Sequence, residues 1–370
     1  MIAVLEDAMQ ANPNDSHAPY YLGNLLFDWQ PQRAHALWET SARLGADFPV
    51  VYRNLAMVYT RQGNQRDKAL AALEKAVQFG GNAMVLNDLD KLYEENGVPP
   101  EKRLSLMEAH QAVVNRDDVI AREINLDIFA GKPDAAIQLL QSRFFRAWEG
   151  GGSFSLGDSW INANLARGHQ QMIDKHYAQA LADYQAALQI PVNLQEATGN
   201  VSGRKVEVSY WIGNAYQAMG DSENAQRFWT DASIAPAGDA AGARPGGPGQ
   251  FRNRGNMGGL AAGVRVEQAT RYYQALALEK LGQSDRARTI FGALIDSGTK
   301  SLGSSPVSKA PFQSNATPAQ RALVADAHYM VGLGQLGLNN QDQARQEFVL
   351  ALKASPDHYA AMQALNSVNR

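Results

Sequence analysis

The stretch Trp211-Ile-Gly-Asn-Ala-Tyr216 begins the clearest copy of a pattern that decides the fold of this chain. Small and aromatic residues follow Gly213 at fixed intervals, namely Tyr216, Gly220, Ala225, Trp229 and Ala232. Gly220 is expected to end a first helix in a backbone conformation that other residues adopt only at a cost. Gly213 leaves room on that helix where a second helix crosses it closely, and Trp229 fills the space around the crossing. The stretch therefore predicts a helix, a turn and a second helix.

The same pattern recurs along the chain. Gly332 is followed by Ala344, Phe348, Ala351 and Pro356, and further copies contain Gly168 with Tyr184, Ala275 with Phe291, Gly23 with Trp38, and Ala56 with Leu73. This set of spaced residues resembles the tetratricopeptide repeat, a helix–turn–helix unit that stacks on its neighbours. The recurrence predicts an all-α fold, a right-handed α-solenoid of about eight units.

The two ends of the chain differ. Leu5, Ala8 and Pro13 occupy the places that Phe, Ala and Pro take in a second helix, so the chain is expected to begin midway through a repeat. Because such a helix exposes an apolar face, we expect either a longer protein whose preceding domain covers it, or self-association through this open end. At the other end, Asp357 is expected to cap a last helix that closes the stack.

Three segments interrupt the pattern. Residues 148–158 contain Trp148-Glu-Gly-Gly-Gly-Ser153, residues 234–263 are rich in Gly, Ala, Pro and Arg, and residues 296–317 are rich in Ser, Gly, Lys and Pro. The segment 234–263 has too little apolar surface to order itself, so we expect a flexible loop there. We therefore expect an N-terminal array at 1–147, a loop at 148–158, and a C-terminal array at 159–370 with long insertions at 234–263 and 296–317.

The composition excludes several classes of protein. The 370 residues are 45% apolar, with a formal net charge of −3, which argues against an electrostatic nucleic-acid binder. There is no cysteine, which rules out disulfides, thiol catalysis and zinc sites of the Cys type. No apolar run approaches the roughly 20 residues that cross a bilayer. Glu6 and Asp7 stand where a signal peptide would be basic. The sequence predicts a cytoplasmic protein with no membrane partner.

The residues that carry chemistry form no catalytic pattern. The seven histidines show no metal-ligand spacing, and no nucleophile elbow or Ser–His–Asp arrangement is present. The glycines after Trp148 lack the spacing of a phosphate-binding loop. The arginines of 234–263 have only Phe251 for aromatic stacking, so a passive insertion is favoured over an RNA-binding segment. We expect no enzyme activity, no metal site, no cofactor and no nucleic-acid partner.

A concave groove is the first candidate binding site. First helices of such repeats line the groove, and the residue after the first-helix glycine points into it, which places Asn24 and Asn214 there. The neighbouring candidates are Tyr20, Arg53 and Asn54. Asn24 and Asn54 match two places of the carboxylate clamp with which some tetratricopeptide domains hold chaperone tails. The other places of that clamp require Lys or Arg and hold Tyr20, Met84 and Asp88 here, which argues against a clamp. Binding of another peptide or domain stays open, and so does a structural role for the asparagines.

The second candidate site is the loop with Trp148 and Glu149. A tryptophan offers a flat apolar face to sugars or aromatic partners, and Glu149 could accept hydrogen bonds from hydroxyl groups. The alternative is that Trp148 packs back onto the array while the glycines form the turn.

Beyond the generic repeat, the chain resembles one group of bacterial tetratricopeptide proteins. The resemblance is carried by Tyr20-Tyr-Leu-Gly-Asn-Leu-Leu26, Phe48-Pro49, Tyr52-Arg-Asn-Leu55, Phe145-Arg-Ala-Trp-Glu-Gly-Gly151 and Tyr329-Met-Val-Gly-Leu-Gly-Gln-Leu-Gly337. In that group the array follows an uncharacterised β-sandwich domain of galactose-mutarotase-like appearance, which implies a link to carbohydrate metabolism. The chain departs from the group at Arg146-Ala147, where His-Pro is usual. The resemblance assigns no catalytic residue.

The sequence therefore predicts a non-enzymatic scaffold whose partner is a protein, a peptide or a fused β-sandwich domain. The alternative is an accessory region of a carbohydrate-active enzyme whose catalytic or sugar-binding domain lies upstream.

Overall fold

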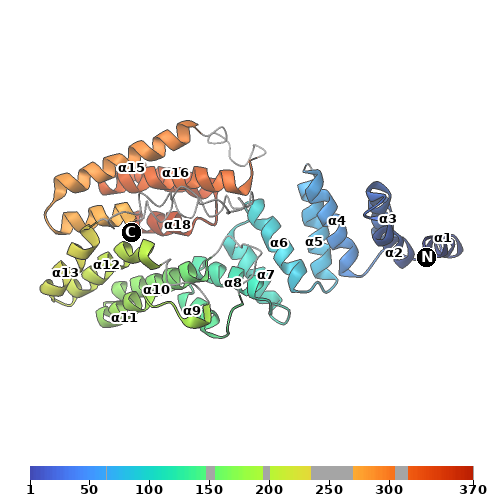
Figure 1. The fold of residues 1–370 in the computed structure, drawn as a ribbon, viewed down its shortest axis with the longest axis horizontal. Helices are drawn as coiled ribbons and strands as arrows, with labels where there is room; N and C mark the ends of the chain where they lie inside the picture. Colours follow the sequence, from blue (N-terminus) through green and yellow to red (C-terminus); the bar gives the residue numbers. More distant parts are fainter. Residues whose placement is uncertain (64, 147–154, 195–200, 235–269, 305–315, 370) are drawn as a thin grey trace, which may run out of the picture. The chain divides into compact units, whose positions relative to one another are not determined.

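The computed structural model describes residues 1–63, 65–146, 155–194, 201–234, 270–304 and 316–369, and these segments form helices and no strands. Residues 270–280 are helical, and the other helices are, in chain order, α1 (Ile2–Ala11), α2 (His17–Leu26), α3 (Pro31–Arg43), α4 (Pro49–Gln62), α5 (Arg66–Gln78), α6 (Ala83–Glu95), α7 (Pro100–Ala109), α8 (Asp117–Phe129), α9 (Pro133–Gln141), α10 (Leu156–Ile173), α11 (Tyr177–Ala187), η1 (Val192–Leu194), α12 (Val201–Ala218), α13 (Ser222–Ser233), α15 (Ser284–Ser304), α16 (Pro318–Gly337), α17 (Gln341–Ala354) and α18 (Tyr359–Val368). The all-α prediction is confirmed (Figure 1).

The chain forms two compact units. Unit 1 contains residues 1–98 and 105–120, and unit 2 contains residues 99–104 and 121–370. This division lies N-terminal to the one expected from the sequence at residues 148–158.

Consecutive helices pack as pairs within each unit. In unit 1, α2 packs on α3 and α4 on α5; in unit 2, α10 packs on α11, α12 on α13 and α16 on α17 (Figure 1). Each pair also contacts a neighbour, as α3 does with α4, α5 with α6, and α11 with α12. Pairs that contact mainly the adjacent pair are the arrangement of a helical solenoid.

The crossing predicted from Gly213 is confirmed. A Cβ atom added at Gly213 would lie 2.5 Å from Nε1 of Trp229, far inside van der Waals contact. Gly23 faces Trp38 in the same way, at 2.6 Å from Nε1. Gly220, two residues after the end of α12, takes a φ of +83°, the left-handed conformation expected for the turn. In these two pairs the first helix can therefore approach the bulky residue of the second because it lacks a side chain at one position.

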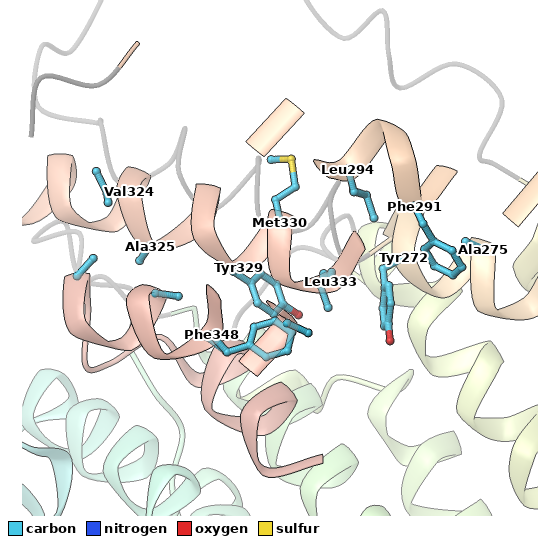
Figure 2. Close-up of a cluster of buried hydrophobic side chains, with 14 of the residues drawn as sticks. Tyr272, Ala275, Phe291, Leu294, Val324, Ala325, Tyr329, Met330, Leu333 and Phe348 are labelled. Carbon is cyan, nitrogen blue, oxygen red and sulfur yellow. The ribbon is translucent and has the colours of Figure 1, made fainter. Parts of the chain in front are cut away.

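A large apolar core of unit 2 lies between residues 270–280, α15, α16 and α17. Figure 2 shows Tyr272 beside Phe291 and Tyr329 beside Phe348, with ring centroids 5.9 and 6.0 Å apart. All four side chains are buried. Burial of one side chain of this size stabilises a fold by about 1.5–3 kcal/mol. Each aromatic pair packs the two helices of one repeat, and the apolar cluster that contains both pairs joins the two successive repeats.

The segment 296–317, expected to be a loop, begins as helix. α15 continues to Ser304, and Gly298 allows this helix to approach α16 closely. A Cβ atom at Gly298 would lie 2.6 Å from Cγ2 of Val331 and 2.7 Å from the carbonyl oxygen of Ala327. Packing on α16 therefore outweighs the low helix propensity of the Ser and Gly residues. Residues 305–315 lie outside the described part, as do 235–263 of the other expected insertion.

The cap expected at Asp357 is made by the next residue. Nδ1 of His358 accepts a hydrogen bond from the backbone N–H of Ala361 at 3.0 Å, and α18 begins at Tyr359. Asp357 pairs instead with Arg103 of α7, within unit 2. The prediction of Asp357 as the N-cap was therefore wrong, because an ion pair with a residue distant in sequence takes its carboxylate.

The first helix, α1, packs on α2 through Leu5 and Met9, which are partly buried against Leu22 and Leu26. Val4 is 66% exposed. Self-association through this end stays a prediction.

Candidate functional site

Three predicted residues meet on the first helices of unit 1. Nδ2 of Asn54 on α4 donates a hydrogen bond to Oδ1 of Asn24 on α2, at 3.0 Å. The indole N–H of Trp38 on α3 donates to the same oxygen, also at 3.0 Å. Beside them, Nε of Arg53 donates to Asp88 of α6 at 2.8 Å. These bonds form a polar row across α2, α4 and α6.

The orientation of the two amide groups follows from chemistry. An indole N–H can only donate, so the atom of Asn24 that faces Trp38 is its oxygen, and Asn54 must turn its N–H group toward that oxygen. This leaves the amide N–H group of Asn24 and the amide oxygen of Asn54 with no hydrogen-bond partner among the residues described. The pair therefore presents one donor and one acceptor, the two groups that an extended peptide backbone needs.

The surroundings of this pair combine charge with apolar surface. Residues three, four and seven apart share one face of a helix. The face of α2 with Asn24 thus carries Tyr20 and Tyr21, the face of α4 carries Val50 and Arg53, and the face of α6 carries Met84 and Asp88. Tyr21, Val50 and Met84 are exposed, at 52%, 43% and 38%. Tyr20 lies against Phe48, with ring centroids 5.0 Å apart.

The ion pair of Arg53 and Asp88 argues against a carboxylate clamp at this face. The side chains are 37% and 32% exposed, and Asp88 holds the guanidinium through Nε. A carboxylate clamp needs cationic side chains that are free to hold a terminal carboxylate, and Asp88 is itself anionic. The structure thus gives a physical reason for expecting no clamp at this face.

The predicted residue of unit 2, Asn214, takes part in the same arrangement as Asn24. Its Oδ1 accepts a hydrogen bond from Nε1 of Trp229 at 3.2 Å, and the preceding Gly213 makes room for the indole. The dipeptide Gly-Asn on a first helix, followed by Trp on the second, therefore has a structural role at both places. Asn214 is 190 positions from Asn24 along the chain and belongs to the other unit, so it is not part of the asparagine pair.

Several buried and partly buried residues of unit 2 were not predicted from the sequence. Arg204 of α12 binds Glu207 at 2.7 Å and Asn162 of α10 at 2.9 Å, and Asp158 lies at 3.8 Å. Burial acts to lower the pKa of Arg204, but the carboxylates of Glu207 and Asp158 outweigh burial and raise it. The guanidinium of Arg204 therefore keeps its charge.

Tyrosines surround this ion pair. Burial is the largest cause that raises the pKa of Tyr273, Tyr329 and Tyr359, and the charge of Glu207 raises it further. The charge of Arg204 opposes this rise at Tyr329 and Tyr359. A regularity in the sequence could have found one of them, because Tyr329, like Tyr210 and Tyr272, stands three positions before the small residue of a first helix. No pattern of that kind marks Arg204 or Glu207.

The remaining predicted residues, Trp148 and Glu149, lie outside the described part of the chain. Within the described segments, no group of His, Cys, Asp and Glu side chains is arranged to hold a metal ion. None of the described helices combines the length and apolar character that crossing a membrane requires.

Paired helices whose crossings depend on glycine define an α-helical repeat protein. Residues 269–297 match the family model described as Tetratricopeptide repeat. The match covers the repeat predicted from Ala275, Gly282, Ala287 and Phe291.

Three solved structures are similar to the chain. YrrB, described as a tetratricopeptide-repeat protein with an unusual peptide-binding site, is 16% identical; the match covers 62% of this chain and 91% of YrrB, with a TM-score of 0.23. The tetratricopeptide domain of P58(IPK) is 14% identical, with coverage of 100% and 92% and a TM-score of 0.23. Human IFIT1, a dimer with PPP-AAAA, is 15% identical, with coverage of 91% and 72% and a TM-score of 0.33. These values are too low to transfer a function to this chain.

Proposed function

We propose that the chain is a non-enzymatic scaffold that binds an extended peptide segment of a partner protein on the first-helix face of unit 1. The observation that carries the proposal is the asparagine pair, in which Asn24 offers an N–H group and Asn54 an oxygen. A peptide group presents the complementary acceptor and donor, whatever its side chains. Recognition at this pair is thus expected to depend on the backbone of the ligand.

The neighbouring side chains set the preference for particular ligand residues. Exposed Tyr21, Val50 and Met84 provide apolar contact, and Met adapts to ligands of different shape. Arg53 uses Nε for Asp88, and none of the described residues accepts from its two Nη groups. An apolar segment with one acidic residue therefore fits this face best.

The test begins with a phage-displayed library of random peptides selected on the full chain. The tightest peptide is then synthesised with a fluorescent label, and its Kd is measured by anisotropy. Asn54→Ala is expected to weaken binding by about 2–10-fold, the cost of one hydrogen bond of about 0.5–1.5 kcal/mol. Asn54 is the cleaner site for substitution because Asn24 also holds Trp38.

The matched control is Asn214→Ala, which removes the partner of Trp229 in unit 2 and leaves unit 1 unchanged. The proposal predicts that this variant binds the peptide like the unmodified chain. If selection yields no binding peptide, or if Asn214→Ala weakens binding as much as Asn54→Ala does, then the face in unit 1 is not the site.

The alternative function, an accessory region of a carbohydrate-active enzyme, depends on Trp148, Glu149 and an upstream domain, and no observation on the described residues favours it. Cytoplasmic location also stays a prediction.

A further inference from the structure

An ion pair made two residues before α18 connects the end of unit 2 to its beginning. Asp357 pairs with Arg103 of α7, which lies 254 positions earlier in the chain. The side chain of Arg103 is 1% exposed and that of Asp357 is 11% exposed. Because a buried charge that loses its partner is strongly unfavourable, the guanidinium favours a carboxylate at this position.

His358 follows and contacts α16. Its Nε2 lies 3.0 Å from Oδ1 of Asp326, and both side chains are 2% exposed. Since Nδ1 accepts the backbone N–H of Ala361, the imidazole proton is on Nε2, which donates to Asp326. The imidazole ring also lies beside Tyr329, with centroids 4.9 Å apart.

Tyr359 completes the series on α8. Its ring meets Phe129 nearly edge-on, with centroids 5.5 Å apart and an interplanar angle of 76°. Edge-to-face pairs of this kind stabilise a contact beyond the burial of the rings. Three consecutive side chains thus contact unit 2 residues of three different helices, namely α7, α16 and α8.

These contacts resemble a bound ligand more than the packing of a solenoid helix. A helix in a solenoid packs on its neighbour in the stack, as α18 does on α17. Residues 357–359 additionally contact other helices. Asp357 provides a carboxylate to the guanidinium of Arg103. His358 provides an N–H donor to the carboxylate of Asp326 and lies beside Tyr329, and Tyr359 places its ring on Phe129. We name Arg103, Phe129, Asp326 and Tyr329 the acceptor surface.

We propose that residues 357–359 occupy the acceptor surface as an internal ligand, and that this surface binds the same chemistry in trans, an acidic–imidazole–aromatic segment of a partner protein, when α18 is released. The partner segment replaces the carboxylate on Arg103, the N–H donor on Asp326 and the ring on Phe129. The surface belongs to unit 2 and involves neither Asn24 nor Asn54, so it is independent of the function proposed for unit 1.

The first measurement is hydrogen exchange of α18 in the full chain. Asp357→Asn removes the anionic partner that α18 supplies to Arg103 and is expected to speed exchange in α18 by at least about 100-fold, while the amides of α12 and α13 keep their protection. The matched control is Asn366→Ala, an exposed position of α18, which is expected to leave exchange unchanged. Equal exchange in the two variants overturns the proposal.

The second measurement is binding in trans. The probe is a fluorescent peptide with the sequence of residues 355–366, compared with a scrambled peptide of the same composition. The Asp357→Asn chain is expected to bind the probe at least about 10-fold more tightly than the unmodified chain, because the internal segment competes less. Equal binding by both chains, or equal binding of the scrambled peptide, overturns the proposal.

A milder variant covers the case in which Asp357→Asn unfolds unit 2. Tyr359→Ala keeps the pair of Asp357 and Arg103 and removes the ring on Phe129, together with the hydroxyl group that accepts from Gln363. It is expected to give a smaller increase in both exchange and probe binding, in the same direction. An increase in exchange without any gain in probe binding shows that the released surface does not act as a receptor, and refutes the proposal.

Discussion

Gly213→Ala tests the close helix crossing on which the repeat depends. The added Cβ would lie 2.5 and 2.6 Å from Nε1 and Cδ1 of Trp229, so the indole must move. Overpacking of this kind costs about 1–3 kcal/mol. Displacement of the indole also breaks its hydrogen bond to Asn214, worth about 0.5–1.5 kcal/mol. The better helix propensity of alanine offsets about 1 kcal/mol of this loss. The expected net loss is about 2 kcal/mol.

The assay is thermal and urea unfolding of the full chain, followed by circular dichroism. A loss of about 2 kcal/mol lowers the Tm of a unit of this size by about 4–8 °C. The matched control is Gly292→Ala on α15, where an added Cβ has no atom within 4 Å. That variant is expected to gain about 1 kcal/mol, since only helix propensity changes.

A second background isolates the contact with the indole. When Gly213→Ala is combined with Trp229→Ala, the glycine substitution is expected to become neutral or stabilising, because its obstacle is gone. The reasoning is refuted if Gly213→Ala and Gly292→Ala change stability equally, or if Gly213→Ala costs the same in both backgrounds.

Three more predictions concern charge and backbone. Burial raises the pKa of Tyr59 to about 12, helped by Glu39, so the folded chain resists its ionisation while the unfolded chain ionises near pH 10. The contribution of Tyr59 to stability is therefore complete below about pH 10 and is lost as the pH rises toward 12. A titration of tyrosinate absorbance alongside circular dichroism measures this loss. Simultaneous ionisation of all tyrosines near pH 10 in the folded chain would contradict it. Arg204→Met leaves Glu207 buried without its partner and should cost about 3–5 kcal/mol in urea unfolding, whereas adding Glu207→Leu should recover most of the loss. Lys175→Gly should raise stability by about 1 kcal/mol, because Lys175 holds a φ of +61° that glycine adopts without strain; no gain would argue against strain there.

The helical pairs could be predicted because their causes are local. Apolar and small residues repeat at helical spacing, and Gly220 takes the left-handed turn that its position predicted. The end of α15 could not be predicted from local sequence in this way. Its Ser- and Gly-rich sequence favours a loop, but Gly298 allows close packing on Val331, and that contact is made by another helix.

The candidate site was predictable in part for the same reason. Asn24, Asn54 and Arg53 could be placed on one face because helix register follows from sequence. Their partners could not, because Trp38 and Asp88 come from other helices. The sequence also left open whether the asparagines bind a ligand or support the fold. The structure shows that Asn24 and Asn214 each hold an indole and so have a structural role, whereas Asn54 holds none.

The sequence by itself determined the class of fold, the crossings at Gly23 and Gly213 and the left-handed turn at Gly220, since each depends on residues within one helical pair. Only the tertiary structure decided that Asp357 pairs with Arg103 and that His358 caps α18 in its place. Local propensity favours the aspartate at 357, because Asp is among the preferred N-cap residues and His is not. The choice is made by a buried guanidinium 254 positions away, which unit 2 brings close only when it is folded.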